Sequence, residues 1–506
     1  MRPRGLGAVV FLAGTGTLAT EIAASRLLAP AFGSSTVVWA NLISVVQAAL
    51  AVGYWLGGKL ADRRPEPRLL GRLVLLAALL VAATPFLARP LLEVAVRAVD
   101  DARAGAVVAS FAAVVLLFAP PVVLLGAVSP FAIRLAVDDL ATAGSVAGRL
   151  YALSTAGSLL GTFVPALVSI PLLGTQRTLL GAGALLALAS APLLGRRALA
   201  PAVALAALAA LLPPGAVRAA DGVIYETESR YQFVQVVERS DGSRLLYLNE
   251  GIAVHSIWRP GTVLTGGAWD MFLAVPPLLG RPLERVAILG NAGGTTARAL
   301  ARFHPQAVVD GVEIDPEVSR VGRRFFGLGE SPNVRVHDED ARPFLRQTDE
   351  RYDLITIDAY RQPYVPFHLA TREFFRLVQE HLRPGGIVAL NVARVPGDNR
   401  LVDGIAGTLA AELPQVIVWP ALRFNALVIG FSRPLSRAEL SRRLRSGPAQ
   451  LAPLRRLLGS ELYSATPADR PWTDDRAPVE WATDRMLVSF ATRGGVLDED
   501  LLPTAP

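Results

Sequence analysis

The sequence predicts a multi-pass α-helical membrane domain, followed by a small β-domain and a doubly wound α/β domain. The 506 residues are 52% hydrophobic and their mean hydropathy is +0.40, too high for an ordinary soluble enzyme. Long apolar segments fill the first part, and strand and helix patterns alternate from residue 285 onward. We therefore expect a membrane domain over 1–217, a β-domain over 222–280, an α/β domain over 281–433 and an extension over 434–506.

The membrane domain is predicted from about seven apolar segments, most of them near the ~20 residues needed to cross ~30 Å of hydrocarbon. These segments cover residues 6–28, 36–58, 69–88, 105–133, 146–173, 177–194 and 198–213. The last two are short, and Pro120-Pro121 predicts a kink in the fourth. Small residues in Ala156-Gly157-Ser158 and Gly181-Ala182-Gly183 predict close packing between helices.

Charge and composition exclude several classes of protein. The net charge is +7, but residues 1–217 carry +8 and the remainder −1, so the positive charge belongs to the apolar half and no nucleic-acid partner is expected. The chain has no cysteine, which excludes disulfides, thiolate metal sites and a cysteine nucleophile. Five scattered histidines make a zinc cluster unlikely, and no metal is expected.

Basic residues in the loops predict the orientation of the membrane domain. Eleven of them lie on the side of the N-terminus and four on the other, which predicts a cytoplasmic N-terminus. Seven spans then put the second half outside. Glu21 and Arg26 lie inside or at the edge of the first span, where they form either a polar pathway or binding site, or a structural ion pair.

A ligand site is predicted at the carboxyl ends of four successive strands of the α/β domain. The first strand, 285–289, runs into the glycine turn 290–294, and Glu313 ends the second strand, well placed for ribose hydroxyls. Asp340 follows the third strand, where a carboxylate is suited to an adenine amino group, and Asp358 ends the fourth. Each acid alone is better explained as a helix cap or loop residue, but four successive strand ends that each carry a ligand-type feature favour a binding site. Without a phosphate-binding lysine, an adenosyl ligand lacking phosphates fits best.

At this point the sequence resembles the spermidine synthase (polyamine aminopropyltransferase) family, in particular its membrane-fused bacterial members. This family is a branch of the Rossmann-like AdoMet-dependent methyltransferase fold. The resemblance rests on these segments: Glu21 to Arg26, Gly57–Asp62, Gly148–Leu153, Thr227–Gln232, 290–294, Val312–Asp315, Asp340-Ala341, Tyr352–Asp358, Pro366–Leu369, Glu373–Phe375 and Thr473–Glu480.

The resemblance implies roles for individual residues. Asp358 is the general base, and the nucleoside part of the donor is held by Gln232, Gly290, Gly293, Gly294, Glu313, Asp340, Ala341 and Pro366. The acceptor amine is bound by Trp269, Asp270, Tyr360 and Arg361. Three positions depart from the family pattern, which has an aspartate at Ala292, Tyr-His-Glu at Ala268-Trp269-Asp270 and a second aspartate at Arg361. A cation at Arg361 repels a diamine, and loss of an acid at Ala292 weakens discrimination against ordinary AdoMet.

The implied function is membrane-bound aminopropyl transfer from decarboxylated AdoMet to a putrescine-like amine, with release of methylthioadenosine. Two alternatives stay open: another AdoMet-dependent transferase, such as a methyltransferase acting on an anionic or lipid-soluble acceptor, and a non-catalytic membrane sensor or transporter. No cofactor is expected to be permanently bound, since decarboxylated AdoMet or AdoMet serves as co-substrate. The implied partners are the lipid bilayer and a second copy of the chain, through the β-domain. The catalytic domain is expected to face the cytosol, where AdoMet compounds are made, although the count of seven spans opposes this.

Overall fold

The chain forms two compact units in the computed structural model. The first comprises Met1–Ala219 with Thr227–Phe233, and the second comprises Ala220–Glu226 with Val234–Pro506. Thr227–Phe233, which is predicted to belong to the β-domain, thus groups with the helices. The structure describes residues 5–32, 36–101, 105–196, 199–211, 222–249, 253–361, 364–460 and 462–493.

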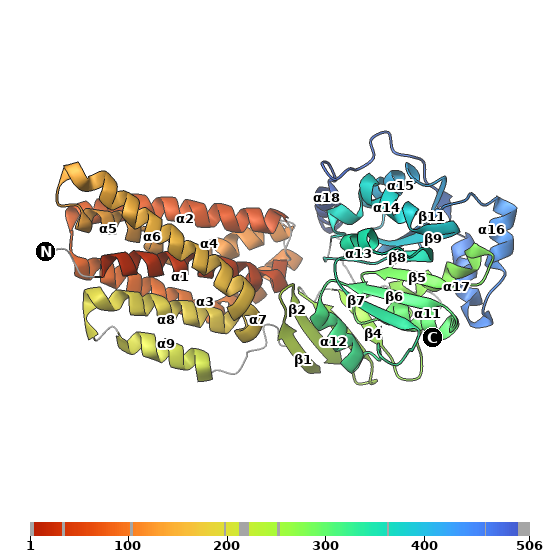
Figure 1. Ribbon diagram of the computed structural model, residues 1–506, viewed down its shortest axis with the longest axis horizontal. Coiled ribbons are helices and arrows are strands. Elements are labelled where there is room, and N and C mark those ends of the chain that lie inside the picture. The colour runs from red at the N-terminus through yellow and green to blue at the C-terminus, as the bar shows by residue number, and fades with distance from the viewer. Residues whose placement is uncertain are drawn as a thin grey trace. The chain divides into compact units, whose positions relative to one another are not determined.

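The first unit is built from long apolar helices (Figure 1). They are α1 (Leu6–Phe32), α2 (Thr36–Arg63), α3 (Pro67–Asp101), α4 (Gly105–Gly126), α5 (Val128–Ala136), α6 (Ala143–Val164), α7 (Ile170–Leu173), α8 (Thr175–Leu194) and α9 (Leu199–Leu211). Within the described residues, six segments are long and apolar enough to cross a membrane: Leu6–Leu28, Trp39–Arg63, Pro67–Ala88, Phe111–Ala136, Leu140–Ser169 and Thr175–Leu194. The seventh predicted span forms the shorter helix α9. The chain stays helical through Pro120-Pro121, where the predicted kink stays a prediction, and α4 ends at Gly126, before α5 begins at Val128.

Small residues let the helices of this unit approach closely, as predicted. A Cβ atom on Gly157 of α6 would lie 2.0 Å from the carbonyl oxygen of Phe11 in α1, and one on Gly161 would lie 2.2 Å from that of Thr15. Glycine is required at these contacts because no side chain fits between the two backbones. Of the predicted pair in α8, Gly183 packs tightly against α3, whereas Gly181 faces open space.

The second unit contains a small antiparallel sheet and a large mixed sheet. The small sheet has the order β1-β2-β3-β4 and the large one the order β12-β10-β11-β9-β8-β5-β6-β7. The strands are β1 (Val223–Glu228), β2 (Phe233–Glu238), β3 (Arg244–Leu248), β4 (Val254–Trp258), β5 (Arg285–Leu289), β6 (Val308–Glu313), β7 (Val334–Asp338), β8 (Tyr352–Ile357), β9 (Leu382–Ala393), β10 (Gln415–Trp419), β11 (Asn425–Phe431) and β12 (Tyr463–Ser464).

The large sheet confirms the predicted Rossmann-like methyltransferase fold. Strands β7, β6, β5, β8 and β9 are parallel, and β11 is inserted antiparallel between β9 and β10. The chain runs outward from β5 to β7 and then returns to β8 on the other side of β5. Ligands of doubly wound sheets bind at such a reversal, beyond the carboxyl ends of the strands. The order of strands therefore predicts a ligand site at the carboxyl ends of β5, β6 and β8.

Helices cover both faces of the large sheet (Figure 1), because its central strands are apolar on both sides. One face packs against α13 (Ala341–Gln347), α14 (Arg372–Glu380), α15 (Arg400–Ala410) and α18 (Val479–Thr492). The other packs against α10 (Ala268–Met271), α11 (Thr295–Phe303) and α17 (Ala452–Ser460). Helix α12 (Pro316–Phe325) packs its apolar face against β2 and β3, and α16 (Arg437–Leu444) belongs to the extension.

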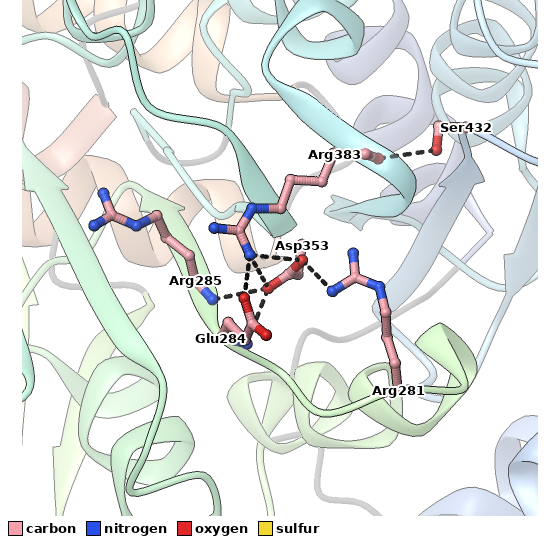
Figure 2. Close-up of polar contacts among 6 residues, drawn as sticks. All are labelled: Arg281, Glu284, Arg285, Asp353, Arg383 and Ser432. Carbon is pink, nitrogen blue, oxygen red and sulfur yellow. Dashed lines mark hydrogen bonds and ion pairs between the residues drawn. The ribbon is translucent and has the colours of Figure 1, made fainter.

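The amino edge of the sheet is closed by a buried carboxylate at the start of β8. Asp353 is fully buried and accepts hydrogen bonds from the backbone N–H groups of Glu284 and Arg285, both at 2.9 Å. Arg281 and Arg383 pair with the same carboxylate at 2.5 and 3.3 Å (Figure 2). Buried charges are tolerated when they are paired in this way, so Asp353 joins three segments at the edge opposite the predicted site.

Candidate active site

The glycine turn after β5 lies directly against the end of β8. Gly290 adopts a φ of +90°, and a Cβ there would lie 2.4 Å from the backbone nitrogen of Ala359. Its N–H and that of Asn291 both donate to the carbonyl of Val312, at 3.0 and 2.9 Å. Only glycine combines this conformation with this approach, so Gly290 brings the turn beside Asp358.

The rest of the turn is held by two neighbouring strands. Ala292 has a positive φ of 45°, unusual for a residue with a side chain, and its N–H donates to the carboxylate of Glu313 at 2.9 Å. The N–H of Gly293 donates to the hydroxyl of Ser256 on β4 at 2.9 Å, and Gly294 caps α11. The predicted residues Gly290, Gly293 and Gly294 therefore form one rigid turn.

Glu313 ends β6 with its carboxylate buried under this turn. One of its oxygens accepts the N–H of Ala292, and the other accepts that of Asp315 at 3.1 Å. Burial raises the pKa of Glu313 to about 7, with a smaller contribution from the negative charge of Asp315, while the backbone donors oppose the shift. Each carboxylate oxygen can accept a second hydrogen bond, so Glu313 is able to bind hydroxyl groups of a ligand.

Asp340 begins α13, and the C-terminal extension braces this region. The carboxylate caps the helix through the N–H of Arg342 at 2.9 Å, and His368 lies 3.8 Å away. The interaction with His368, followed by that cap, holds the pKa of Asp340 below its usual range. Arg342 donates to both carboxylate oxygens of Asp474, at 2.8 and 2.6 Å, and Thr371 donates to the same group at 2.7 Å. Asp340 is thus a charged acceptor on a fixed helix end, beside the buried Ala341.

Asp358 lies just past the end of β8, partly exposed, beside the glycine turn. Its backbone N–H donates to the carbonyl of Leu289 at 2.8 Å, and its carboxylate accepts a hydrogen bond from the amide of Asn391 at 2.9 Å. Burial raises the pKa of Asp358 to about 7, and the Asn391 donor acts in the opposite direction. A carboxyl group that titrates near neutral pH is suited to act as a general base.

The residues that follow Asp358 differ in their environment. The Tyr360 hydroxyl donates to the carbonyl of Asn391 at 2.9 Å and accepts the N–H of Ala393 at 2.7 Å, so it joins this segment to β9. Arg361 is exposed, and its backbone pairs with that of Tyr364. Pro366 precedes a short 3-10 turn that leads to His368. The predicted binding roles of Tyr360, Arg361 and Pro366 stay predictions.

The remaining predicted residues are engaged in their own loops. The buried Asp270 carboxylate accepts from the N–H and hydroxyl of Thr265 and from the N–H of Gly266, which favours a structural role. Trp269 is half-buried beside Gly267. Gln232 lies in the segment that groups with the first unit, where its backbone forms a turn with Ser229. Their roles in binding stay predictions.

Four residues at the carboxyl edge were missed from the sequence: Ser256, Asn391, Asn425 and Arg342. Asn391 comes directly after the apolar run Ile387–Leu390, as Asp358 comes after that of β8, and this position could have identified it. The other three could not be found this way, because their importance depends on which strand or segment packs beside them.

Part of the second unit is similar to known proteins. Residues 270–402 match the family model of the spermine/spermidine synthase domain. The chain is 34% identical over 188 residues to a probable polyamine aminopropyl transferase of Bifidobacterium longum, covering 37% of this chain and 41% of that protein. It is 32% identical over 175 residues to the polyamine aminopropyltransferase of Vibrio vulnificus, covering 33% and 58% respectively. The chain therefore spans about half the length of the curated relatives it matches.

Among solved structures, the chain is similar to a probable spermidine synthase from Corynebacterium glutamicum. The TM-score is 0.39 at 20% identity, over 57% of this chain and 99% of that one. The segment that matches the family model contains Gly290, Glu313, Asp340 and Asp358.

Proposed function

Because residues 270–402 match the family model of the spermine/spermidine synthase domain, we propose that the second unit is an aminopropyltransferase. It transfers an aminopropyl group from decarboxylated AdoMet to an amine such as putrescine, and methylthioadenosine leaves. The observation that carries this proposal is the Asp358 carboxyl, which lies beside the glycine turn and has a pKa raised to about 7 by burial.

The reaction needs a base and alignment of the two substrates. The acceptor nitrogen attacks the carbon next to the sulfonium, the carbon–sulfur bond breaks, and its electron pair stays on the sulfur of methylthioadenosine. Asp358 takes the proton that the amine loses, and it does so as a carboxylate, so the rate rises as pH increases through about 7. Glu313 accepts hydrogen bonds from the ribose, and Asp340 with Ala341 binds the adenine, so the donor is held at the turn.

Product analysis with the purified full-length protein tests this function. Putrescine and decarboxylated AdoMet are expected to give methylthioadenosine and an aminopropylated amine. The variant Asp358→Asn is expected to lose turnover by a factor of about 10²–10⁴ while still binding methylthioadenosine. Absence of methylthioadenosine across a panel of amines would exclude the proposal.

A second candidate is methyl transfer from ordinary AdoMet to an anionic acceptor. It is favoured by Arg361, an exposed cation three residues after Asp358, and by Ala292, which puts no negative charge on the turn. Incubation with ordinary AdoMet distinguishes this reaction from the first, because methyl transfer releases S-adenosylhomocysteine. Nucleoside binding without turnover of either donor would instead support the sensor or transporter that the sequence left open.

We propose that the six long apolar helices place the protein in a membrane. Contacts within the first unit indicate at which end of these helices residues 227–233 lie. Thr175, at the start of α8, donates through its N–H and hydroxyl to the Glu228 carboxylate at 3.1 and 2.8 Å, and Arg26 donates to the carbonyl of Arg230. Gly5, at the other end of α1, lies against Pro192 near the end of α8. Residues 227–233 are therefore at the end of the helices away from the N-terminus.

Because decarboxylated AdoMet is made in the cytosol, we propose that the end carrying residues 227–233 faces the cytoplasm. The N-terminal end of α1 then lies outside, contrary to the prediction from the eleven basic residues. Since the chain has no cysteine, a single cysteine can be introduced at the exposed Ser145 or at the exposed Ser441. The labelling of each variant by an impermeant maleimide is then measured on intact cells. Labelling of Ser145→Cys alone is expected. Labelling of Ser441→Cys alone would exclude a cytosolic donor.

We also propose that the β-domain mediates a homodimer, on the resemblance alone. The mass of the detergent-solubilised full chain tests this. A monomer at micromolar concentration would contradict it.

A further inference from the structure

Three polar side chains form a row across the carboxyl edge of the sheet, on three adjacent strands. Ile357 pairs with Leu390, so the next residues, Asp358 and Asn391, are neighbours on parallel strands. Because β11 is antiparallel, its first residue, Asn425, lies at the same edge and pairs with Ala393, two residues after Asn391. The fold thus brings one residue from each of β9 and β11 into line with Asp358.

Hydrogen bonds give this row a direction. The Asn425 side-chain amide donates to the side-chain oxygen of Asn391 at 2.9 Å, and the Asn391 amide donates to Asp358, also at 2.9 Å. A rotated Asn391 amide would point its oxygen at the Asp358 carboxylate and its NH₂ at the NH₂ of Asn425. Asn391 is 7% exposed. The Asn425 donor therefore keeps the NH₂ group of Asn391 directed at Asp358.

We propose that Asn391 and Asn425 are positioning residues that orient the Asp358 carboxylate and stabilise its deprotonated form. This inference rests on the proposed role of Asp358 as base. A hydrogen bond from a neutral donor favours the charged form of a carboxyl group, so it opposes the effect of burial. Without it, a larger fraction of Asp358 would be protonated at pH 7, and that fraction is unable to accept the proton of the amine.

The groups around Asp358 are consistent with this role. Two effects set the pKa of Asp358: burial raises it and the hydrogen bond from Asn391 lowers it. Neither effect involves a charged side chain. Among the described residues, Tyr360 is a titratable group whose pKa is raised by burial and, to a smaller extent, by Asp358, so that this phenol stays neutral. Because the Tyr360 hydroxyl also binds the backbone of β9 at Asn391 and Ala393, the base and its donor are fixed to the same strand.

The test compares the pH dependence of kcat/KM in variants of the full-length protein. Asn391→Leu removes the donor at nearly constant volume, and Asn425→Leu removes only the group that orients it. Asn333→Leu is the matched control, because the Asn333 amide donates to the carbonyl of Ala307, remote from the row. Methylthioadenosine formation from decarboxylated AdoMet and putrescine is followed from pH 5.5 to about 10, and thermal unfolding verifies that each variant is folded.

Loss of a hydrogen bond to a charged group is expected to move the pH midpoint of Asn391→Leu upward by about one unit. The rate at pH 7 then falls about fivefold and recovers to the wild-type value near pH 9.5. A smaller shift in the same direction is expected for Asn425→Leu, and none for Asn333→Leu. A merely structural role would lower the rate equally at every pH.

Two results would overturn the inference, and they differ in what they leave standing. If both leucine variants keep the wild-type midpoint while Asp358→Asn is inactive, Asp358 is the base but Asn391 and Asn425 do not position it. If Asp358→Asn turns over normally, the base assignment fails and the positioning role fails with it.

Discussion

Strand β8 carries an aspartate at each end, and we predict that the two have opposite effects when changed to asparagine. Asp353, at the amino edge, holds three segments together (Figure 2) and lies at the end of β8 opposite to the glycine turn. Asp358, at the carboxyl edge, accepts one hydrogen bond from a side chain and lies beside that turn. Asp353→Asn is expected to lower stability and leave turnover intact, and Asp358→Asn to abolish turnover and leave stability intact.

The expected loss of stability in Asp353→Asn follows from the partners of its carboxylate. Removing one partner of a buried ion pair costs about 3–5 kcal/mol. The side chains of Arg281 and Arg383 are 35% and 32% exposed, so water partly replaces the lost carboxylate and the lower end, about 3 kcal/mol, applies. For a domain of this size, that corresponds to a fall in Tm of roughly 6–12 °C.

For Asp358→Asn the expected effect on the free energy of unfolding has the opposite sign. Burial raises its pKa from 3.8 to about 7, so its contribution to the free energy of unfolding is present below pH 4 and is lost as pH rises to about 7. Asparagine cannot ionise, so Asp358→Asn is expected to be at least as stable as the wild type at pH 8.

Calorimetry of the full chain in detergent and turnover at 25 °C measure both effects in the same preparations. Asp353→Asn is expected to unfold at lower temperature and keep kcat within about twofold. Unchanged unfolding of Asp353→Asn would refute the account of the amino edge. A loss of kcat in Asp353→Asn with a normal Tm would show that the two ends of β8 do not act separately.

Three further changes probe the turn and the nucleoside residues. Gly290→Ala places a Cβ against the backbone of Ala359, so loss of both methylthioadenosine binding and folding yield is expected; retention of both would refute the close approach. Because burial raises the pKa of Glu313 to about 7, calorimetric affinity for methylthioadenosine is expected to rise between pH 6 and 8, and Glu313→Gln to abolish that rise; a pH-independent wild type would contradict this. Asp474→Asn weakens the salt bridge to Arg342, so a severalfold higher KM for the donor with unchanged kcat is expected; an unchanged KM would show that the extension does not brace α13.

The sequence predicted the central strands closely because their physical signal is local. The sequence predicts strands over 285–289, 308–313, 415–419 and 425–431, and β5, β6, β10 and β11 have these bounds, since each is a short apolar run between polar turns. The predicted helices, near 294–303, 316–325, 370–382 and 401–412, do not include α13, because it has only seven residues, two of them arginines, and little apolar periodicity.

In the β-domain the alternation of residues predicts two long strands, Tyr225–Val237 and Arg244–Val254. The structure has four short ones, because turns inside a run of alternating residues leave no clear gap.

The site was predictable only where sequence order determines position. Gly290, Glu313 and Asp358 lie at the carboxyl ends of parallel strands, so their common edge follows from the alternation of strands and helices. Asn425 begins a strand instead, and it reaches the same edge only because β11 is inserted antiparallel next to β9. That insertion depends on long-range pairing, which no local pattern reveals. The same holds for Asp474, which reaches Arg342 from 132 residues away.

The environments of the three acids at this edge separate their roles. Asp340 has its pKa lowered by His368 and its helix cap, so it stays charged and can only accept hydrogen bonds. Glu313 and Asp358 both have pKa values raised to about 7 by burial, and this alone does not distinguish them. Both oxygens of Glu313 accept backbone N–H groups, so protonation would weaken one of these hydrogen bonds, whereas Asp358 has one oxygen on Asn391 and is partly exposed. Of the two, only Asp358 can take up a proton without disrupting its support, so it is the one that we assign as the base.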